Sequence, residues 1–257
     1  MPNRKELNEL EQKNKKIAIR LAIFFACLIL IDFIVMALLF GWQDWVACLI
    51  FSLLFIAPAY ISNASMVITG GGKPIDGGKN WRDGRRIFGD HKTWNGLIKG
   101  PLYIGIPVSI GIFLLFLALW QYILPIVETA NAQGQYKLYA SVKIFEYYFI
   151  GGPFPIGFLS LIIRIILCSY GAGLGDLIGS FLKRRVNIES GAPFWVVDQL
   201  DFAVIAILFT SIPAFFIPQL FLVPDIYIII FLIILTPSVS VIANTVAYLI
   251  GIKDVPW

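Results

Sequence analysis

The chain has 257 residues, of which 58% are hydrophobic and only 14% are charged. A soluble domain of this length needs a charged surface, so the composition excludes an ordinary soluble protein and favours a membrane protein. The formal net charge of +4 is modest, so the distribution of the charges along the chain is more informative than their sum.

The N-terminal stretch MPNRKELNELEQKNKK is polar and carries charges of both signs. The apolar run after it is longer than the hydrophobic part of a cleavable signal peptide, which argues against such a signal. We therefore expect a cytosolic N-terminal arm at 1–16, followed by a single membrane domain at 17–257.

Apolar segments follow at about 17–40, 45–68, 101–124, 149–170, 202–222 and 226–250. At about 1.5 Å per helical residue, segments of this length cross a hydrocarbon core of roughly 30 Å. Pro213 and Pro218 interrupt the fifth segment, so five spans plus a re-entrant segment is an alternative to six spans. The sequence thus predicts an all-α polytopic membrane protein with five or six transmembrane helices.

Positive charge is unevenly distributed over this topology. If the N-terminus is cytosolic, the Lys and Arg residues fall in cytosolic segments or at their membrane boundaries, except Lys137, Lys143 and Arg164. The positive-inside rule therefore predicts that both termini are cytosolic. Two cytosolic loops, 69–100 and 171–201, hold most of the charge, and we expect them to share an active site at that membrane face. The outer segment 125–148 suggests no chemistry.

The first charged loop begins TGGGKPIDGGKN and continues WRDGRRIFGDHKTWNG. Glycines such as Gly71 and Gly72 let backbone N–H groups approach an anion, although the spacing does not match a Walker loop. Basic side chains suit phosphate oxygens, and carboxylates suit a hard cation such as Mg²⁺. The interleaved charges are Asp76, Asp83 and Asp90 with Lys79, Arg82, Arg85, Arg86 and Lys92. They favour a metal–nucleotide or metal–phosphate ligand, and the alternative is that they pair with one another. His91, the only histidine, is expected to be incidental.

The second charged loop reads GAGLGDLIGSFLKRRVNIESGAPFWVVDQLDF. On a helix, one face would carry a carboxylate, a hydroxyl and two cations, namely Asp176, Ser180, Lys183 and Arg184, and would extend a span into the cytosol. Asp198 and Asp201, three residues apart, can point the same way and share a divalent ion. The alternative reading is helix capping, with Asp198 as the N-cap and Asp201 in the first turn.

Together the two loops resemble those of the integral-membrane cytidylyltransferases, and in particular the CDP-archaeol synthases. The first match runs from Asn63 through GGGKPIDGGKNWRDGRRIFGDHKTWNG, and the second is GDLIGSFLKRR…GAPFWVVDQLDF. The DQLD element and the missing K-D and H-G-G signatures favour the archaeol-type branch over the related CDP-diacylglycerol synthases. The resemblance covers most of the chain from residue 20, without the N-terminal arm or 125–148.

The resemblance implies transfer of a cytidylyl group from CTP to a lipid phosphate, with Mg²⁺, giving a CDP-lipid and pyrophosphate. Asp176, Asp198 and Asp201 would bind the metal ion. Lys183 and Arg184 would neutralise phosphate charge, so that Asp198, Asp201, Lys183 and Arg184 form the catalytic set. The CTP and phosphate contacts would come from Gly71, Gly72, Asp76, Lys79, Asp83, Arg86, Lys92, Thr93 and Ser180. We expect a cell-membrane location, contacts with membrane lipids and no nucleic-acid partner.

Two questions stay open in the sequence. The lipid tails could be isoprenoid ethers, as in 2,3-bis-O-geranylgeranylglycerol 1-phosphate, or fatty-acyl esters, as in phosphatidic acid. A non-enzymatic transporter or scaffold would place polar groups at mid-membrane, where only Asp32 and Arg164 stand out. Arg164 could reach a lipid phosphate near the inner face, or it could snorkel or pair. The sequence identifies no partner for Asp32 and does not specify an oligomeric state.

Overall fold

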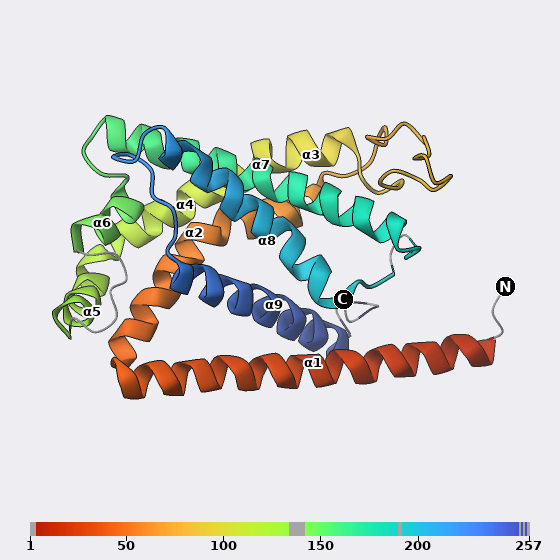
Figure 1. Ribbon diagram of the computed structural model, residues 1–257, viewed down its shortest axis with the longest axis horizontal. Helices are drawn as coiled ribbons and strands as arrows, with labels where there is room; N and C mark the ends of the chain where they lie inside the picture. Colours follow the sequence, from red (N-terminus) through yellow and green to blue (C-terminus); the bar gives the residue numbers. More distant parts are fainter. Residues whose placement is uncertain (1–3, 134–141, 190–191, 252, 254, 256–257) are drawn as a thin grey trace.

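The computed structural model describes residues 4–133, 142–189, 192–251, 253 and 255. Over these ranges the chain is helical and contains no β-strand (Figure 1). The helices are α1 (Arg4–Leu39), α2 (Trp42–Ile68), α3 (Trp94–Gly100), the π-helical turn η1 (Pro101–Gly105), α4 (Ile106–Ala118), α5 (Trp120–Gln133), α6 (Val142–Ile150), α7 (Ile156–Arg185), α8 (Trp195–Ser211), the 3₁₀ turn η2 (Ile212–Phe215) and α9 (Ile226–Leu249).

Among these described residues, six helical segments are long and apolar enough to cross a membrane. They are Glu11–Leu39, Trp42–Ile68, Trp94–Ala118, Ile156–Arg185, Trp195–Phe215 and Ile226–Leu249. The prediction of an all-α polytopic membrane protein is confirmed, with six candidate spans rather than five. The protein is a multi-pass membrane protein.

The fourth and fifth spans differ from their expected limits. α7 starts at Ile156 and continues to Arg185, well beyond the apolar run that was expected to end at 170, because polar residues extend the same helix. α8 starts at Trp195 rather than at 202 and gives way to η2, which contains Pro213. The segment 171–201 is therefore two helix ends and a short connection rather than one long loop.

The outer segment 125–148 is partly helical. It contains the end of α5 and the start of α6. Its residues 134–141, including Lys137, lie outside the described residues.

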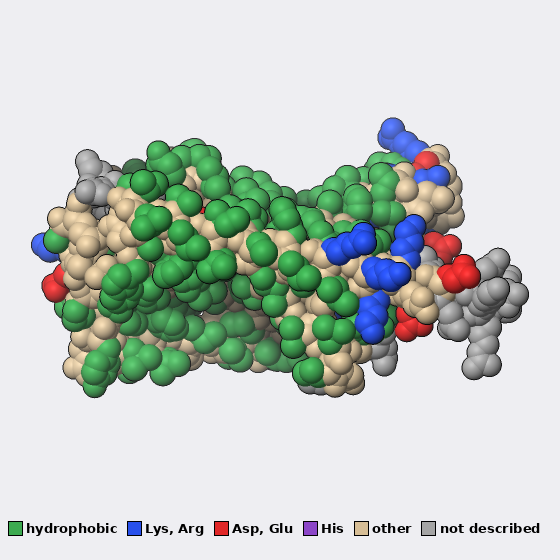
Figure 2. Space-filling view, turned by 90° about the horizontal axis from the view of Figure 1, so that it is seen from below, with side chains coloured by type: hydrophobic (Ala, Val, Ile, Leu, Met, Phe, Trp, Pro, Cys, Tyr) green, Lys and Arg blue, Asp and Glu red, His purple; other side chains and the backbone are tan. Residues whose placement is uncertain are grey.

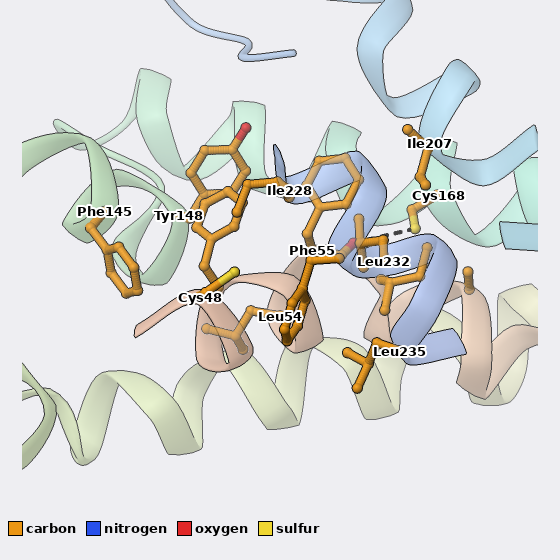
Figure 3. Close-up of a cluster of buried hydrophobic side chains, with 14 of the residues drawn as sticks. Cys48, Leu54, Phe55, Phe145, Tyr148, Cys168, Ile207, Ile228, Leu232 and Leu235 are labelled. Carbon is orange, nitrogen blue, oxygen red and sulfur yellow. Dashed lines mark hydrogen bonds between the residues drawn. The ribbon is translucent and has the colours of Figure 1, made fainter. Parts of the chain in front are cut away.

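The hydrophobic core is built around α2, whose Phe51 and Ile56 are completely buried. Figure 3 shows Leu54 and Phe55 of the same helix among side chains from α6, α7, α8 and α9. The Phe51 ring meets the Tyr148 ring of α6 edge-on, with the centroids 4.6 Å apart. Cys168 of α7 donates a weak hydrogen bond to the Phe55 carbonyl oxygen of α2. Side chains from α2, α6, α7, α8 and α9 therefore form one continuous core.

α1 lies alongside α9 at the edge of the bundle (Figure 1). Ala18, Phe25 and Met36 of α1 are buried, whereas only 11% of its apolar window is buried. Figure 2 shows a surface that is hydrophobic over most of its length, with Lys and Arg side chains concentrated toward one end. Such a surface suits a bilayer whose lipid contacts the apolar zone.

The two ionisable side chains expected inside spans both have partners. Trp45 donates a hydrogen bond from Nε1 to Asp32 Oδ2 at 2.8 Å, which links α1 to α2. The Arg164 guanidinium is buried and lies 4.0 Å from the centroid of the Tyr148 ring and 5.1 Å from that of Tyr147. Arg164 also precedes Asp176 by about 18 Å of helix. Arg164 therefore has partners within the bundle, as one of the two readings expected. It lies too far along α7 to contact a phosphate at the predicted site.

Candidate active site

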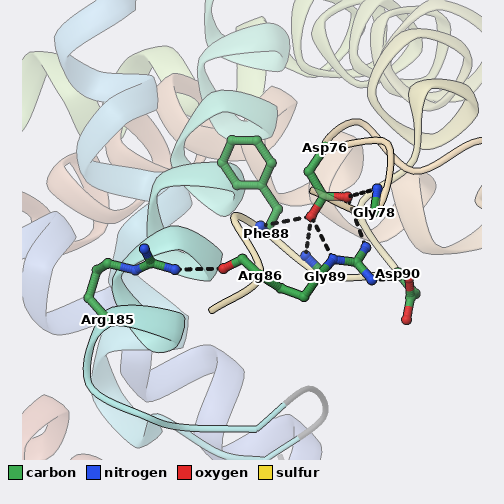
Figure 4. A network of polar contacts seen from close by, with 7 residues as sticks. All are labelled: Asp76, Gly78, Arg86, Phe88, Gly89, Asp90 and Arg185. Atoms are coloured by element: carbon green, nitrogen blue, oxygen red, sulfur yellow. Dashed lines mark hydrogen bonds and ion pairs between the residues drawn. The ribbon is translucent and has the colours of Figure 1, made fainter. Parts of the chain in front are cut away.

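The loop between α2 and α3 folds around the carboxylate of Asp76 (Figure 4). Arg86 donates to it through Nη2 at 2.8 Å and Nε at 3.2 Å. The backbone N–H groups of Gly78, Phe88 and Gly89 donate to it at 3.0 to 3.1 Å. Because the Asp76 side chain is fully buried and accepts all these bonds, it is the organising centre of the loop.

These contacts change the acidity of Asp76. Burial by itself would raise its pKa, but the hydrogen bonds from Arg86 and from the N–H groups of Phe88, Gly89 and Gly78 outweigh burial and lower the pKa below the ordinary value of 3.8. The Asp76 and Asp90 carboxylates in turn raise the pKa of Arg86. The pair stays charged at neutral pH and holds the loop closed.

A second set of contacts fastens this loop to the end of α7. Arg185 donates to Asp83 Oδ1 at 2.8 Å and to the Arg86 carbonyl oxygen at 2.6 Å (Figure 4). Arg85 donates to the Arg185 carbonyl oxygen at 2.9 Å. The Trp81 ring meets the Phe181 ring edge-on, 5.4 Å apart. The two charged segments, which are about 100 residues apart in sequence, therefore form one body.

A cavity of about 370 Å³ lies where this loop meets α2, α3 and α7, within the size range of ligand sites. Its polar lining consists of Asn63, Asp90, His91, Lys92, Thr93 and Asp176, and Gly71 and Gly72 form part of its wall. Met66, Leu97 and Leu177 supply apolar lining. The cavity thus joins charged groups to apolar surface at the end of the spans.

Local backbone geometry explains how several of these residues reach the cavity. Gly71 and Gly72 have φ values of +100° and +82°, which side-chain-bearing residues rarely adopt. A side chain at Gly72 would also collide with Asn95, whose Nδ2 lies 2.7 Å from the position of a Cβ. Thr93 is the N-cap of α3, and its hydroxyl accepts a hydrogen bond from the Gly96 N–H at 3.2 Å.

Two ion pairs connect predicted cations to predicted metal ligands. Lys92 Nζ lies 2.7 Å from both carboxylate oxygens of Asp176. Lys183 Nζ lies 2.9 Å from Asp198 Oδ2, which also accepts the Phe194 N–H at 2.8 Å. The N-cap of α8 is Phe194, so the alternative reading of Asp198 as the N-cap is wrong. Asp198 lies in the first turn and satisfies the N–H of the capping residue.

The third predicted metal ligand, Asp201, lies against α7, with its carboxyl group over the backbone of Gly179. Together with Asp176 and Asp198 it makes up the predicted set of metal ligands. Among the described residues, no three His, Cys, Asp or Glu side chains form a ready-made metal site. The three carboxylates nevertheless supply oxygen ligands of the kind Mg²⁺ prefers, and two of them are held by lysines.

The predicted site residues are thus not all in one place. The structure brings Gly71, Gly72, Lys92, Thr93 and Asp176 together in the cavity wall. Asp76, Asp83 and Arg86 form the loop contacts described above, and Lys79 is exposed. Ser180 is buried on α7, and Arg184 donates to the Ile188 carbonyl oxygen.

Some residues of the site were missed or undervalued from the sequence. His91, expected to be incidental, lines the cavity. Arg185, left out of the predicted set, joins the loop to α7. Its position beside Lys183 and Arg184 marked it only as one more basic residue.

The fold and this cavity define a polytopic helical membrane protein with a charged site at one end of its spans. The model of the CarS-like family, described as CDP-archaeol synthase, matches residues 45–257, and the chain belongs to this family. The resemblance of the two charged loops is thereby confirmed. The match begins within α2, so α1 lies outside it.

Individual relatives agree with this placement. The chain is 39% identical over 209 residues to the CDP-archaeol synthase of Thermococcus onnurineus, covering 81% of this chain and 97% of the relative. It is 37% identical over 216 residues to that of Thermococcus kodakarensis, covering 84% and 100%. It is 38% identical over 202 residues to the CDP-archaeol synthase of Methanosarcina barkeri, covering 78% of this chain and 99% of the relative.

One solved structure is also similar. It is described as an intramembrane enzyme for archaeal membrane lipids biosynthesis, and it shares 26% identity with this chain. The TM-score is 0.44, with 77% of this chain and 92% of the other covered.

Proposed function

We propose that the protein transfers the cytidylyl group of CTP to an archaeal-type lipid phosphate, 2,3-bis-O-geranylgeranylglycerol 1-phosphate. The products are CDP-archaeol and pyrophosphate. The observation that carries this proposal is the family match over residues 45–257, together with the cavity into which the matched Lys92 and Asp176 both project.

The chemistry needs few groups. A phosphate monoester has a second pKa near 6, so at neutral pH it is already largely ionised and needs no general base. The barrier arises from bringing two anions together and from stabilising the departing pyrophosphate. Cations held in fixed positions lower that barrier, and Lys92 and Lys183 are fixed by their ion pairs.

The two ion pairs suggest how substrate is received. In each pair a predicted phosphate ligand, Lys92 or Lys183, neutralises a predicted metal ligand, Asp176 or Asp198. A magnesium nucleotide carries both complementary charges. On binding, the lysines would turn to its phosphates and the carboxylates to its metal ion, so the buried charges would stay compensated throughout.

Asp176, Asp198 and Asp201 are the residues that would hold Mg²⁺. Their carboxylate oxygens suit a hard cation. When bound, the ion would neutralise negative charge on the phosphates during transfer. Arg184, next to Lys183, is available to help bind the pyrophosphate if it leaves its contact with the Ile188 carbonyl oxygen.

The lipid phosphate would reach the cavity sideways from the membrane. The span Trp94–Ala118 has only 22% of its apolar window buried, so it faces lipid along most of its length. Its first helix, α3, contributes Gly96 and Leu97 to the cavity wall, and the capping residue Thr93 lies beside them. A lipid phosphate could therefore enter the cavity while its chains stay beside α3 and α4. The excess of Lys and Arg residues at this end of the spans supports a cytosolic location for this face.

The test is an assay of the purified full-length protein with labelled CTP and Mg²⁺. One reaction receives the geranylgeranyl ether phosphate and a second receives phosphatidic acid. We expect a CDP-lipid from the ether substrate. Product from phosphatidic acid alone would favour the CDP-diacylglycerol synthase alternative. Product from neither would refute cytidylyl transfer and leave a transporter or scaffold.

A further inference from the structure

α7 meets α8 along a row of glycines spaced one helical turn apart, Gly171, Gly175 and Gly179. At two of them the backbone of α8 occupies the place of a side chain. A Cβ at Gly171 would lie 2.9 Å from the Ala206 Cα, and one at Gly175 would lie 2.6 Å from the Phe202 Cα. Small residues at these positions let the two helix backbones approach closely.

Gly179 differs from the other two glycines. The three nearest atoms that a Cβ would meet there belong to the side chain of Asp201, with Cβ at 2.9 Å, Cγ at 2.7 Å and Oδ2 closer still. The carboxyl group of Asp201 thus occupies the volume in which the residue 179 side chain would lie. The nearest obstacle at this position is the Asp201 side chain rather than the backbone of α8.

Glycine inside a helix is less favourable than alanine, so alanine at 179 would stabilise α7 itself. The contact that opposes alanine is the one with Asp201. The Asp201 carboxyl is anchored on its other side, because Oδ1 accepts the Phe202 N–H at 2.6 Å. Its orientation is therefore set by α8 through one oxygen and by the bare surface of α7 through the other.

We propose that Gly179 is a positioning residue for Asp201. The missing side chain lets the Asp201 carboxylate pack against α7. There it lies about one helical turn from Asp176 along α7 and from Asp198 along α8. This inference rests on the proposed function, in which Asp201 contributes to metal–nucleotide binding. Gly179 itself would touch neither substrate nor metal ion. It acts only through the place that it leaves for Asp201.

The test compares Gly179→Ala with two other glycine substitutions in the full-length protein. Gly111→Ala in α4 is the matched control, because nothing lies within 4 Å of a Cβ there. Gly175→Ala meets the backbone of α8 and is the control for forcing the helices apart. Each variant is measured for Tm, for turnover and for the affinity of Mn²⁺·CTP without lipid, by calorimetry.

Because the Asp201 Cβ would lie 2.9 Å from the added methyl group, we expect Gly179→Ala to lower the Tm, but by less than Gly175→Ala does. Its Mn²⁺·CTP affinity and turnover should each fall about 10- to 100-fold, as when a group that orients a metal ligand is lost. Gly111→Ala should behave like the wild type. Gly175→Ala should lower the Tm. In a background carrying Asp201→Asn, Gly179→Ala should cause no further loss of affinity, because the two changes act through one carboxylate.

The outcomes distinguish a failure of the positioning role of Gly179 from a failure of the assignment of Asp201. Wild-type affinity and turnover in Gly179→Ala would overturn the positioning role and leave the proposed function intact. A fall in Tm as large as that of Gly175→Ala, or a failure to fold, would also overturn it, as would equal losses of affinity with and without Asp201→Asn. Normal affinity and turnover in Asp201→Asn alone would instead refute the assignment of Asp201 on which the inference rests.

Discussion

Lys92 and Asp176 form a two-pronged ion pair across the cavity, with Nζ 2.7 Å from each carboxylate oxygen. Lys92 belongs to the loop before α3, and Asp176 lies 84 residues further along the chain, on α7. Both side chains are about one-quarter exposed. The pair therefore joins the two charged segments at the point where ligand would enter.

Replacing Lys92 with alanine should lower kcat/KM about 100-fold. The change removes a fixed cation from the phosphate site and leaves the charge of Asp176 uncompensated. Steady-state kinetics with CTP as the varied substrate measures the effect. Lys99→Ala is the matched control, because Lys99 is exposed and lies outside the cavity lining. Equal losses in the two variants would contradict the assignment of Lys92.

Asp198→Asn and Asp201→Asn should each reduce CTP-dependent turnover below about 1% of the wild-type rate while expression is preserved. Both changes keep the shape of the side chain and remove the charge that a metal ion requires. Asp225→Asn is the control, since Asp225 caps α9 by accepting the Ile228 N–H and asparagine caps helices equally well. Near-normal activity in either site variant would rule that residue out as a metal ligand.

Asp76→Asn should open the loop without unfolding the bundle. An amide cannot compensate the Arg86 charge, and loss of a buried hydrogen-bond partner costs about 1–3 kcal/mol. Hydrogen exchange at the N–H groups of Gly78, Phe88 and Gly89 should then accelerate roughly 5- to 150-fold. The amides of the buried helix α2 are the internal reference. Unchanged exchange in the loop would show that Asp76 does not organise it.

The same carboxylate gives the loop a defined pH dependence. The pKa of Asp76 is lower in the folded loop than its ordinary value of 3.8, so its ionisation stabilises the folded state. This stabilisation is fully present above the ordinary pKa and is lost as the pH falls from there through the lowered folded pKa. Loop exchange protection attributable to Asp76 should be constant between pH 5 and 8, and decline below about pH 4.

Arg185→Ala should release the loop from α7, because it removes the bonds to Asp83 and to the Arg86 carbonyl oxygen. We expect faster proteolytic cleavage between residues 79 and 90 and a higher KM for CTP. Arg185→Lys should restore little, since lysine lacks the forked guanidinium that reaches both acceptors. Arg82→Ala is the control, because Arg82 is exposed and contacts the neighbouring Trp81 ring.

Sequence patterns predicted the features that depend on local composition. Apolar runs located the spans, and helical spacing placed Asp176, Ser180 and Lys183 on one helix that continues past the apolar zone. The sequence also indicated that Lys92 and Asp176 belong to one site, through motif resemblance.

The pattern could not show which charges pair. Asp76 resembled Asp83 and Asp90 in the sequence, yet only its position in the folded loop lets it accept three backbone N–H groups. Gly179 carried no signal either, because its significance depends on where α8 places Asp201. Both facts arise from tertiary contacts between segments that have no fixed spacing along the chain.

The Lys92–Asp176 and Lys183–Asp198 pairs also have a thermodynamic consequence for binding order. If free CTP bound the two lysines, two carboxylates would lose their compensating charges. If a divalent ion bound the carboxylates without CTP, the two lysine ammonium groups would lose theirs. Each ligand therefore removes an obstacle to the other, so nucleotide and metal ion should bind with positive cooperativity. If the proposed function holds, a site whose charges are paired in this way should discriminate against inorganic anions and free cations and admit the metal–nucleotide complex.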